Sequence, residues 1–282
     1  MDSQTTVEFA DKLPLKPLQG ERAMVDIFPV TLAGYACPLI DPPSQRHMFE
    51  NKIHNIELAI SRMRPLILAS GQAFSFWDCA LAPTLDNGYR EGAMFVNRRV
   101  VGSVGGGLCQ LSGCLYNLAL LAGLEILERH NHSIDAYGEA RYIPLGCDAT
   151  VAFGRKDLRF RNPHRVPVGL ELSVDRRQVS GQVMSTQPLE CAIRIETALI
   201  KTIASPRKRV ADRDVALGEE IVEPGLTGKV VRAWRVFERP GQSARRESLS
   251  RDRYRETPTR VRYGARTTPW PARLRNLFGL HG

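Results

Sequence analysis

Three consecutive glycines lead directly into a long apolar segment, and this junction constrains the fold more than any other part of the chain. Gly105, Gly106 and Gly107 come immediately before a segment in which leucines between positions 108 and 124 recur at helical spacing. Because glycine costs backbone entropy, three in a row indicate unusual backbone angles or a close backbone approach. We therefore predict a tight turn followed by a buried helix that Gly123 closes.

Cys109 would lie in the first turn of that helix. Unpaired backbone N–H groups and the positive end of the helix dipole favour a thiolate there. The same N–H groups, together with Gln110, are suited to hold an oxyanion. A cysteine nucleophile needs a base, usually a histidine that a third polar group orients, and we predict His132 as the base and Asp148 as the orienting group. The order Cys, His, Asp is that of a papain-like or transglutaminase-like arrangement, an analogy at the level of fold only.

Other roles for these residues stay open. Cys109 is equally consistent with a structural or ligand-contacting thiol, His132 with a hydrogen-bonded structural histidine, and Asp148 with a turn cap. Zinc is a further alternative for a set made of Cys109, Cys114, His130, His132 and Cys147. The spacing C-x4-C…H-x-H matches no closed structural zinc site. We predict no metal or other cofactor, and reduced thiols for all six cysteines.

A carboxylate chemistry is also possible. Glu91 lies just upstream of the glycine turn and could protonate a glycosidic oxygen, with Asp78, Asp86 or Asp148 as its partner. The aromatic segment 74–77 could line a sugar site, although a core strand explains it equally well. The predicted substrate-binding residues are Trp77, Tyr89, Gly105, Gly106, Gly107 and Ser112.

Several motifs together resemble one known family. They are the segments 55–59 (NIELA), 71–77 (GQAFSFW), 89–92 (YREG), 105–112 (GGGLCQLS), 129–132 (RHNH) and 146–151 (GCDATV), followed by Asp157-Leu158 and Asn162. On these motifs, about residues 50–172 resemble the VanW-like proteins, named after an accessory product of vancomycin-type glycopeptide resistance clusters. The GGGLCQ block between the FSFW and DATV segments is highly specific.

The resemblance implies a link to the cell envelope and to peptidoglycan or a related envelope polymer as partner. The family pattern favours His132 over His130 and carries Glu or Asp at the position of Glu91, so it supports both the thiol and the carboxylate hypotheses. A non-catalytic envelope-binding or accessory module is the alternative. Many relatives are anchored or exported, whereas residues 1–30 show no apolar signal core and no apolar run is long enough to span a membrane. A cytoplasmic location is therefore expected, with envelope association implied by the resemblance.

The positive charge is concentrated at one end of the chain. The net charge is +9, yet residues 232–282 contain 13 Arg and 4 acidic residues, while residues 1–231 contain 26 basic and 26 acidic residues. This distribution makes nucleic acid an improbable partner. Arg251, Arg253 and Arg255 alternate and would share one face of a strand. A solvated face is the simple interpretation, and binding to an anionic surface is the alternative.

The expected fold is α+β: a glycine-rich turn and helix packed on a mostly antiparallel sheet, with a small β-rich C-terminal appendage. The expected segments are 1–43 (irregular), 44–200 (VanW-like domain), 201–264 (appendage) and 265–282 (tail). Ser44 is the expected N-cap of a helix over 45–64. The expected strands and hairpins are 67–69, 74–77, 93–101, 125–130, 132–137, 148–153, 158–162, 166–172, 180–200 and 230–263.

Overall fold

The computed structural model describes residues 4–5, 23–39, 46–96, 99–138 and 141–265. The chain divides into two compact units. The first comprises Met1–Thr202 and Lys229–Tyr254, and the second comprises Ile203–Gly228 and Arg255–Gly282. Residues 229–254, which the sequence placed in the C-terminal appendage, thus belong to the same unit as the candidate site.

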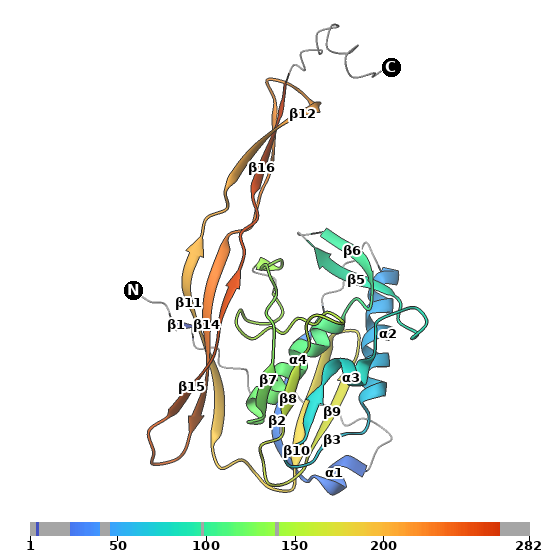
Figure 1. Ribbon diagram of the computed structural model, residues 1–282, viewed down its shortest axis with the longest axis vertical. Helices are drawn as coiled ribbons and strands as arrows, with labels where there is room; N and C mark the ends of the chain where they lie inside the picture. Colours follow the sequence, from blue (N-terminus) through green and yellow to red (C-terminus); the bar gives the residue numbers. More distant parts are fainter. Residues whose placement is uncertain (1–3, 6–22, 40–45, 97–98, 139–140, 266–282) are drawn as a thin grey trace. The chain divides into compact units, whose positions relative to one another are not determined.

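The core of the first unit is a four-stranded antiparallel sheet covered by the predicted apolar helix (Figure 1). The strand order is β2 (Val30–Pro38), β10 (Gln178–Ser185), β9 (Val168–Val174) and β3 (Leu66–Leu68). Helix α4 (Leu108–Leu121) packs against β2 and β10. Most of its residues are buried, which explains why leucine and alanine occur around its whole circumference.

A second helix and a hairpin pack around the turn that precedes α4. Helix α2 (Arg46–Met63) confirms the helix predicted over 45–64, and it packs against β5 (Glu91–Val96), which pairs with β6 (Arg99–Val104). The predicted N-cap, Ser44, lies outside the described residues, as does the hairpin turn at 97–98.

The aromatic segment 74–77 is only partly a strand. Strand β4 (Ala73–Ser75) pairs with β8 (Arg159–Arg161), which also pairs with β7 (Glu125–Glu128). Helix α3 (Phe76–Ala80) then begins, because the hydroxyl of Ser75 accepts the N–H of Asp78 at 3.2 Å and caps it. The prediction that the strand continues to Trp77 is therefore wrong.

Three further sequence-based assignments differ from the structure. Residues 1–43 are not irregular throughout, since they include α1 (Ala23–Ile27) and the sheet strand β2. The strands predicted over 132–137 and 148–153 are instead irregular segments, apart from an isolated bridge between Ala152 and Lys156. Their alternating apolar and polar residues imitate a strand, but their backbone groups bond to side chains and turns.

A long hairpin completes the first unit. Strand β14 (Gly228–Glu238) pairs with β15 (Arg245–Tyr254), in a sheet ordered β1 (Gln4–Thr5), β11 (Ala192–Ile203), β14 and β15. On β15, Arg251 and Arg253 are exposed while Asp252 and Tyr254 are buried. The alternation predicted for the arginines is confirmed over these positions.

The second unit contains a three-stranded sheet. Strand β16 (Thr259–Gly264) lies between β12 (Arg207–Leu217), to which it is parallel, and β13 (Glu220–Glu223), to which it is antiparallel. The predicted α+β class, with mostly antiparallel sheets, is confirmed. Among the described residues, no helix combines the length and apolarity needed to cross a membrane.

Candidate active site at the start of helix α4

The glycine turn has the two properties that its composition indicates. Gly105 and Gly107 have φ angles of +81° and +108°, which side-chain-bearing residues rarely adopt. A Cβ on Gly106 would lie 2.4 Å from the carbonyl oxygen of Gly92, so the backbone itself occupies that space. The side-chain amide of Asn55, on α2, donates to the carbonyl oxygens of Arg90 at 2.9 Å and Gly106 at 3.0 Å and so fixes the turn.

Cys109 lies in the first turn of α4, directly after this turn. Its Sγ atom is 3.4 Å from the hydroxyl of Thr150 and 3.6 Å from the carbonyl oxygen of Val151. Among the described residues, the backbone N–H of Cys109 has no hydrogen-bond acceptor, as expected for the first turn of a helix. A thiol and an unused N–H donor thus sit on one residue at the positive end of a helix.

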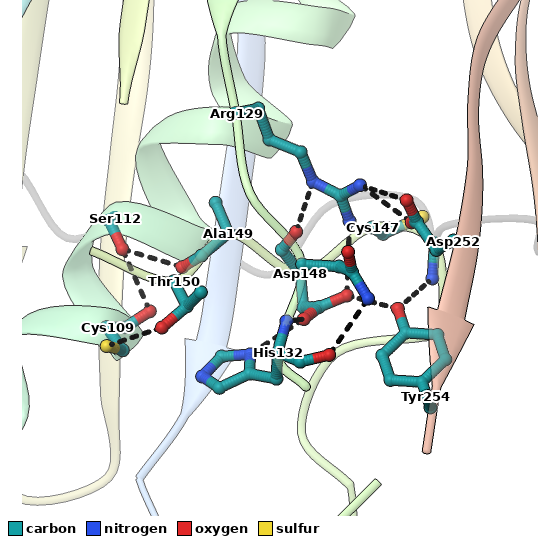
Figure 2. Close-up of polar contacts among 12 residues, drawn as sticks. Cys109, Ser112, Arg129, His132, Cys147, Asp148, Ala149, Thr150, Asp252 and Tyr254 are labelled. Atoms are coloured by element: carbon teal, nitrogen blue, oxygen red, sulfur yellow. Dashed lines mark hydrogen bonds and ion pairs between the residues drawn. The ribbon is translucent and has the colours of Figure 1, made fainter. Parts of the chain in front are cut away.

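His132 is bound to Asp148 by two hydrogen bonds that end on the same oxygen. The backbone N–H and the imidazole Nδ1 of His132 both donate to Oδ2 of Asp148, at 2.7 and 2.6 Å. Because Nδ1 carries the proton for the carboxylate, Nε2 is left for another partner. Figure 2 shows the imidazole ring lying between Asp148 and Cys109, whose thiol interacts with it.

The charges of the three groups are coupled. Burial raises the pKa of the Cys109 thiol. Hydrogen bonding to His132 and the positive charge of His132 outweigh this effect and lower the pKa to about 7. Burial lowers the pKa of His132, while Asp148 and Cys109 raise it to about 10. Burial raises the pKa of Asp148, and His132 and Arg129 bring it down to about 2. The arrangement therefore favours a thiolate beside an imidazolium near neutral pH.

Residues that the sequence analysis did not select hold Asp148 in place. Arg129 donates Nε to the backbone carbonyl of Asp148 at 2.6 Å and one terminal nitrogen to Oδ1 at 3.2 Å. Its other terminal nitrogen donates to both oxygens of Asp252, at 2.7 and 2.6 Å. The hydroxyl of Tyr254 donates to Oδ1 of Asp148 and accepts the N–H of Gly146 at 2.8 Å. For Asp252 and Tyr254, the signal was the alternation Arg-Asp-Arg-Tyr at the end of β15, in which the acidic and aromatic side chains are buried.

Cys109, His132 and Asp148 line one cavity of about 450 Å³. Its lining also includes the predicted residues Trp77, Gly105, Gly106, Gly107 and Gln110. The Nε2 of Gln110 donates to the carbonyl oxygen of Pro38 at 2.6 Å. That bond fixes the amide, which also interacts with the Cys37 thiol.

The other predicted site residues lie elsewhere. Glu91 is exposed on β5 and is not part of the cavity lining. Tyr89 is 1% exposed, and its hydroxyl donates a hydrogen bond to the carbonyl oxygen of Ala80 at 2.6 Å. Ser112 is buried and donates to the carbonyl of Ala149 at 2.8 Å, which ties α4 to the segment carrying Asp148.

Three residues of the zinc alternative, His130, Cys114 and Cys147, are not part of the cavity lining. The imidazole of His130 binds Glu128 at 2.9 Å, and Cys114 is buried within the core cluster. Within the described part of the chain, no group of three or more His, Cys, Asp or Glu side chains is arranged to hold a metal ion.

These observations define an α+β protein with a Cys–His–Asp arrangement at a helix N-terminus. Comparison with known families agrees with the resemblance: residues 51–184 match the family model described as "VanW like protein", so this region of the chain is VanW-like. The match includes the glycine turn, Cys109, His132 and Asp148. The resemblance stated from the motifs is thus confirmed.

Two curated relatives share this region. The vancomycin B-type resistance protein VanW of Enterococcus faecalis (strain ATCC 700802 / V583) is 28% identical over 155 residues, which cover 55% of this chain and 56% of that protein. The uncharacterized protein YoaR of Bacillus subtilis (strain 168) is 33% identical over 119 residues, which cover 42% of this chain and 38% of that protein. The chain thus spans about half of the length of the first relative and less than half of the second.

A solved structure titled "IgA1 Protease G5 domain structure" is 26% identical to part of the chain. The alignment covers 28% of this chain and 93% of that one, with a TM-score of 0.23.

Proposed function

We propose that this protein is a cysteine-dependent hydrolase or acyl transferase that acts on an amide or ester of peptidoglycan or a related envelope polymer. The observation that carries the proposal is the position of the His132 imidazole, which is hydrogen-bonded through Nδ1 to Asp148 and lies between that carboxylate and Cys109 at the start of α4 (Figure 2). The envelope substrate rests on the VanW-like family, one relative of which is named as a vancomycin B-type resistance protein.

The proposed reaction has two halves: Cys109 first forms a thioester with the substrate, and the thioester is then cleaved. The Cys109 thiolate attacks the carbonyl carbon, and the oxyanion is held by the Cys109 N–H together with the side-chain amide of Gln110. The bond to the leaving amine or alcohol then breaks, and the leaving group takes a proton from Nε2 of His132. Water or an acceptor amine gives that proton back to His132 as it attacks the thioester, and the thiolate is released.

Two experiments test the proposal. In the first, alkylation by iodoacetamide at neutral pH should be much faster at Cys109 than at Cys191, a partly exposed thiol outside the cavity. In the second, purified peptidoglycan is incubated with the protein and with Cys109→Ser, and soluble products are analysed. Products that disappear in Cys109→Ser support the proposal.

The same experiments address the two alternatives. Retention on peptidoglycan without products, and with no fast thiol, favours a binding or accessory module. Products that persist in Cys109→Ser and vanish in Glu91→Gln favour glycan cleavage, which the exposed position of Glu91 outside the cavity does not support.

A further inference from the structure

Lys52 is a buried cation on the wall of the candidate site. It lies on α2 and is 8% exposed, yet its side chain lines the same cavity as Cys109. Within the part of the chain that the structure describes, no hydrogen bond or ion pair joins Lys52 to another residue. A buried ammonium group normally has an acidic partner, because desolvating a lone charge is costly.

The position of Lys52 brings it to the start of α4. A Cβ on Gly107 would lie 2.7 Å from Cγ of Lys52, so the lysine stem runs directly along the last glycine of the turn. Burial lowers the pKa of Lys52 to about 8, which an interaction with Cys37 partly offsets. At neutral pH the side chain is therefore mostly protonated, and its charge adds to the positive end of the helix dipole.

We propose that Lys52 and the first turn of α4 bind a carboxylate of the substrate, beside the bond that Cys109 attacks. This inference deepens the proposed function, since it names a substrate class: an amide or ester that carries a free carboxylate, such as a peptide with a free C-terminus. Two other cations close to the cavity are already paired with an acidic side chain, although Nε of Arg141 has no hydrogen-bond partner among the described residues. Arg141 binds Asp135 at 2.7 Å, and Lys229 binds the same carboxylate at 2.6 Å.

Competition between two alkylating agents tests the carboxylate site. Iodoacetate and iodoacetamide deliver the same carbon to a thiol and differ in one carboxylate. We expect Lys52→Met to lower the ratio of the iodoacetate rate to the iodoacetamide rate at Cys109 by about tenfold, the value of one charge-assisted hydrogen bond. Lys52→Arg should retain most of the ratio. Lys208→Met, the same charge change at an exposed position of the second unit, should leave it unaltered.

The outcomes separate this inference from the proposed function. Fast reaction with iodoacetamide and an unaltered ratio in Lys52→Met would overturn the carboxylate site and leave the thiol chemistry standing. A fall in both rates by the same factor would also overturn it, because Lys52 would then act only on the thiolate.

If Cys109 reacts no faster than Cys191, the proposed function fails, and a binding measurement decides the carboxylate site alone. N-acetylglycine and its neutral amide, N-acetylglycinamide, are titrated into Cys109→Ser while the backbone amide signal of Gly107 is followed by NMR. A saturable shift with the acid only, lost in Lys52→Met/Cys109→Ser, supports the site. Equal shifts with both compounds, or none, refute it.

Discussion

His132 donates both its backbone N–H and its ring Nδ1–H to one oxygen of Asp148, at 2.7 and 2.6 Å. This double contact fixes the ring orientation as well as the tautomer, because the main chain and the side chain are bound to the same atom. The remaining ring nitrogen is then directed at Cys109 without any contribution from regular secondary structure (Figure 2).

The pH dependence of Cys109 alkylation should reveal the contact with His132. The thiolate is the reactive form and exists above the thiol pKa, so the rate should rise with a midpoint at about 7 rather than at the ordinary 9.0. In His132→Gln the midpoint should move upward, and the rate at pH 7 should fall by roughly tenfold or more. The measurement is modification against pH, followed by peptide mass spectrometry. An unaltered midpoint in His132→Gln would show that the two side chains do not interact.

Asp148→Asn should weaken the fold in a pH-dependent way. The carboxylate has a pKa of about 2 in the folded protein, against 3.8 ordinarily. It therefore contributes about 2 kcal/mol above pH 3.8, and this contribution is lost as the pH falls through 2. The variant also leaves Arg129 undercompensated, so we expect a loss of about 2–4 kcal/mol at neutral pH that shrinks in acid.

Urea unfolding at several pH values measures this effect, and Asp86→Asn is the matched control because Asp86 is exposed. A loss for Asp148→Asn that stays constant down to pH 2 would contradict the prediction.

Tyr254→Phe should show that β15 supports the candidate site. The change removes the donor to Asp148 and the acceptor for the N–H of Gly146, both of them buried. We expect a loss of about 1–3 kcal/mol in stability and a slower alkylation of Cys109. Arg251→Ala, on the exposed face of the same strand, should alter neither property. Thermal unfolding and the iodoacetamide rate are the two readouts, and equal behaviour of the two variants would rule out this role of the hairpin.

Arg129→Lys tests geometry at constant charge. Arg129 spans Asp148 and Asp252 with a fork of donors, and its guanidinium lies 5.1 Å from the centre of the Tyr116 ring. Lysine supplies one ammonium group and cannot serve both carboxylates in this way. We expect a loss of about 2–4 kcal/mol in the free energy of unfolding, measured by urea denaturation. Arg161→Lys, in an exposed pair with Glu125, should cost less than about 1 kcal/mol.

Gly107→Ala should disturb the turn more than a positive φ angle alone explains. The new Cβ would meet Cγ of Lys52 at 2.7 Å and its carbonyl oxygen at 3.1 Å. Gly154 also has a positive φ, of +73°, but no atom lies within 4 Å of its Cβ position. Gly154→Ala should therefore cost about 1 kcal/mol, and Gly107→Ala about 1–3 kcal/mol more. Equal losses of stability in Gly107→Ala and Gly154→Ala on thermal unfolding would show that Lys52 moves aside at no cost.

The amino-acid sequence by itself determined the elements whose cause is local. Helix α4 follows from its leucine spacing and from Gly123, which has a φ of +72°. Helix α2 follows from its apolar stripe and from Pro65. The glycine turn follows from a composition that only unusual backbone angles explain. The placement of Cys109 in the first turn of α4 needed nothing more than these.

Tertiary structure decided what surrounds that thiol. The segments carrying His132 and Asp148 alternate like strands, yet they are irregular because the carboxylate of Asp148 takes the backbone N–H that a neighbouring strand would otherwise bind. Tyr254 reaches Asp148, and Asp252 reaches Arg129, from more than a hundred positions away. Lys52 reaches the same cavity from α2. Such contacts join distant segments through side chains, and no local pattern encodes which of these segments will meet.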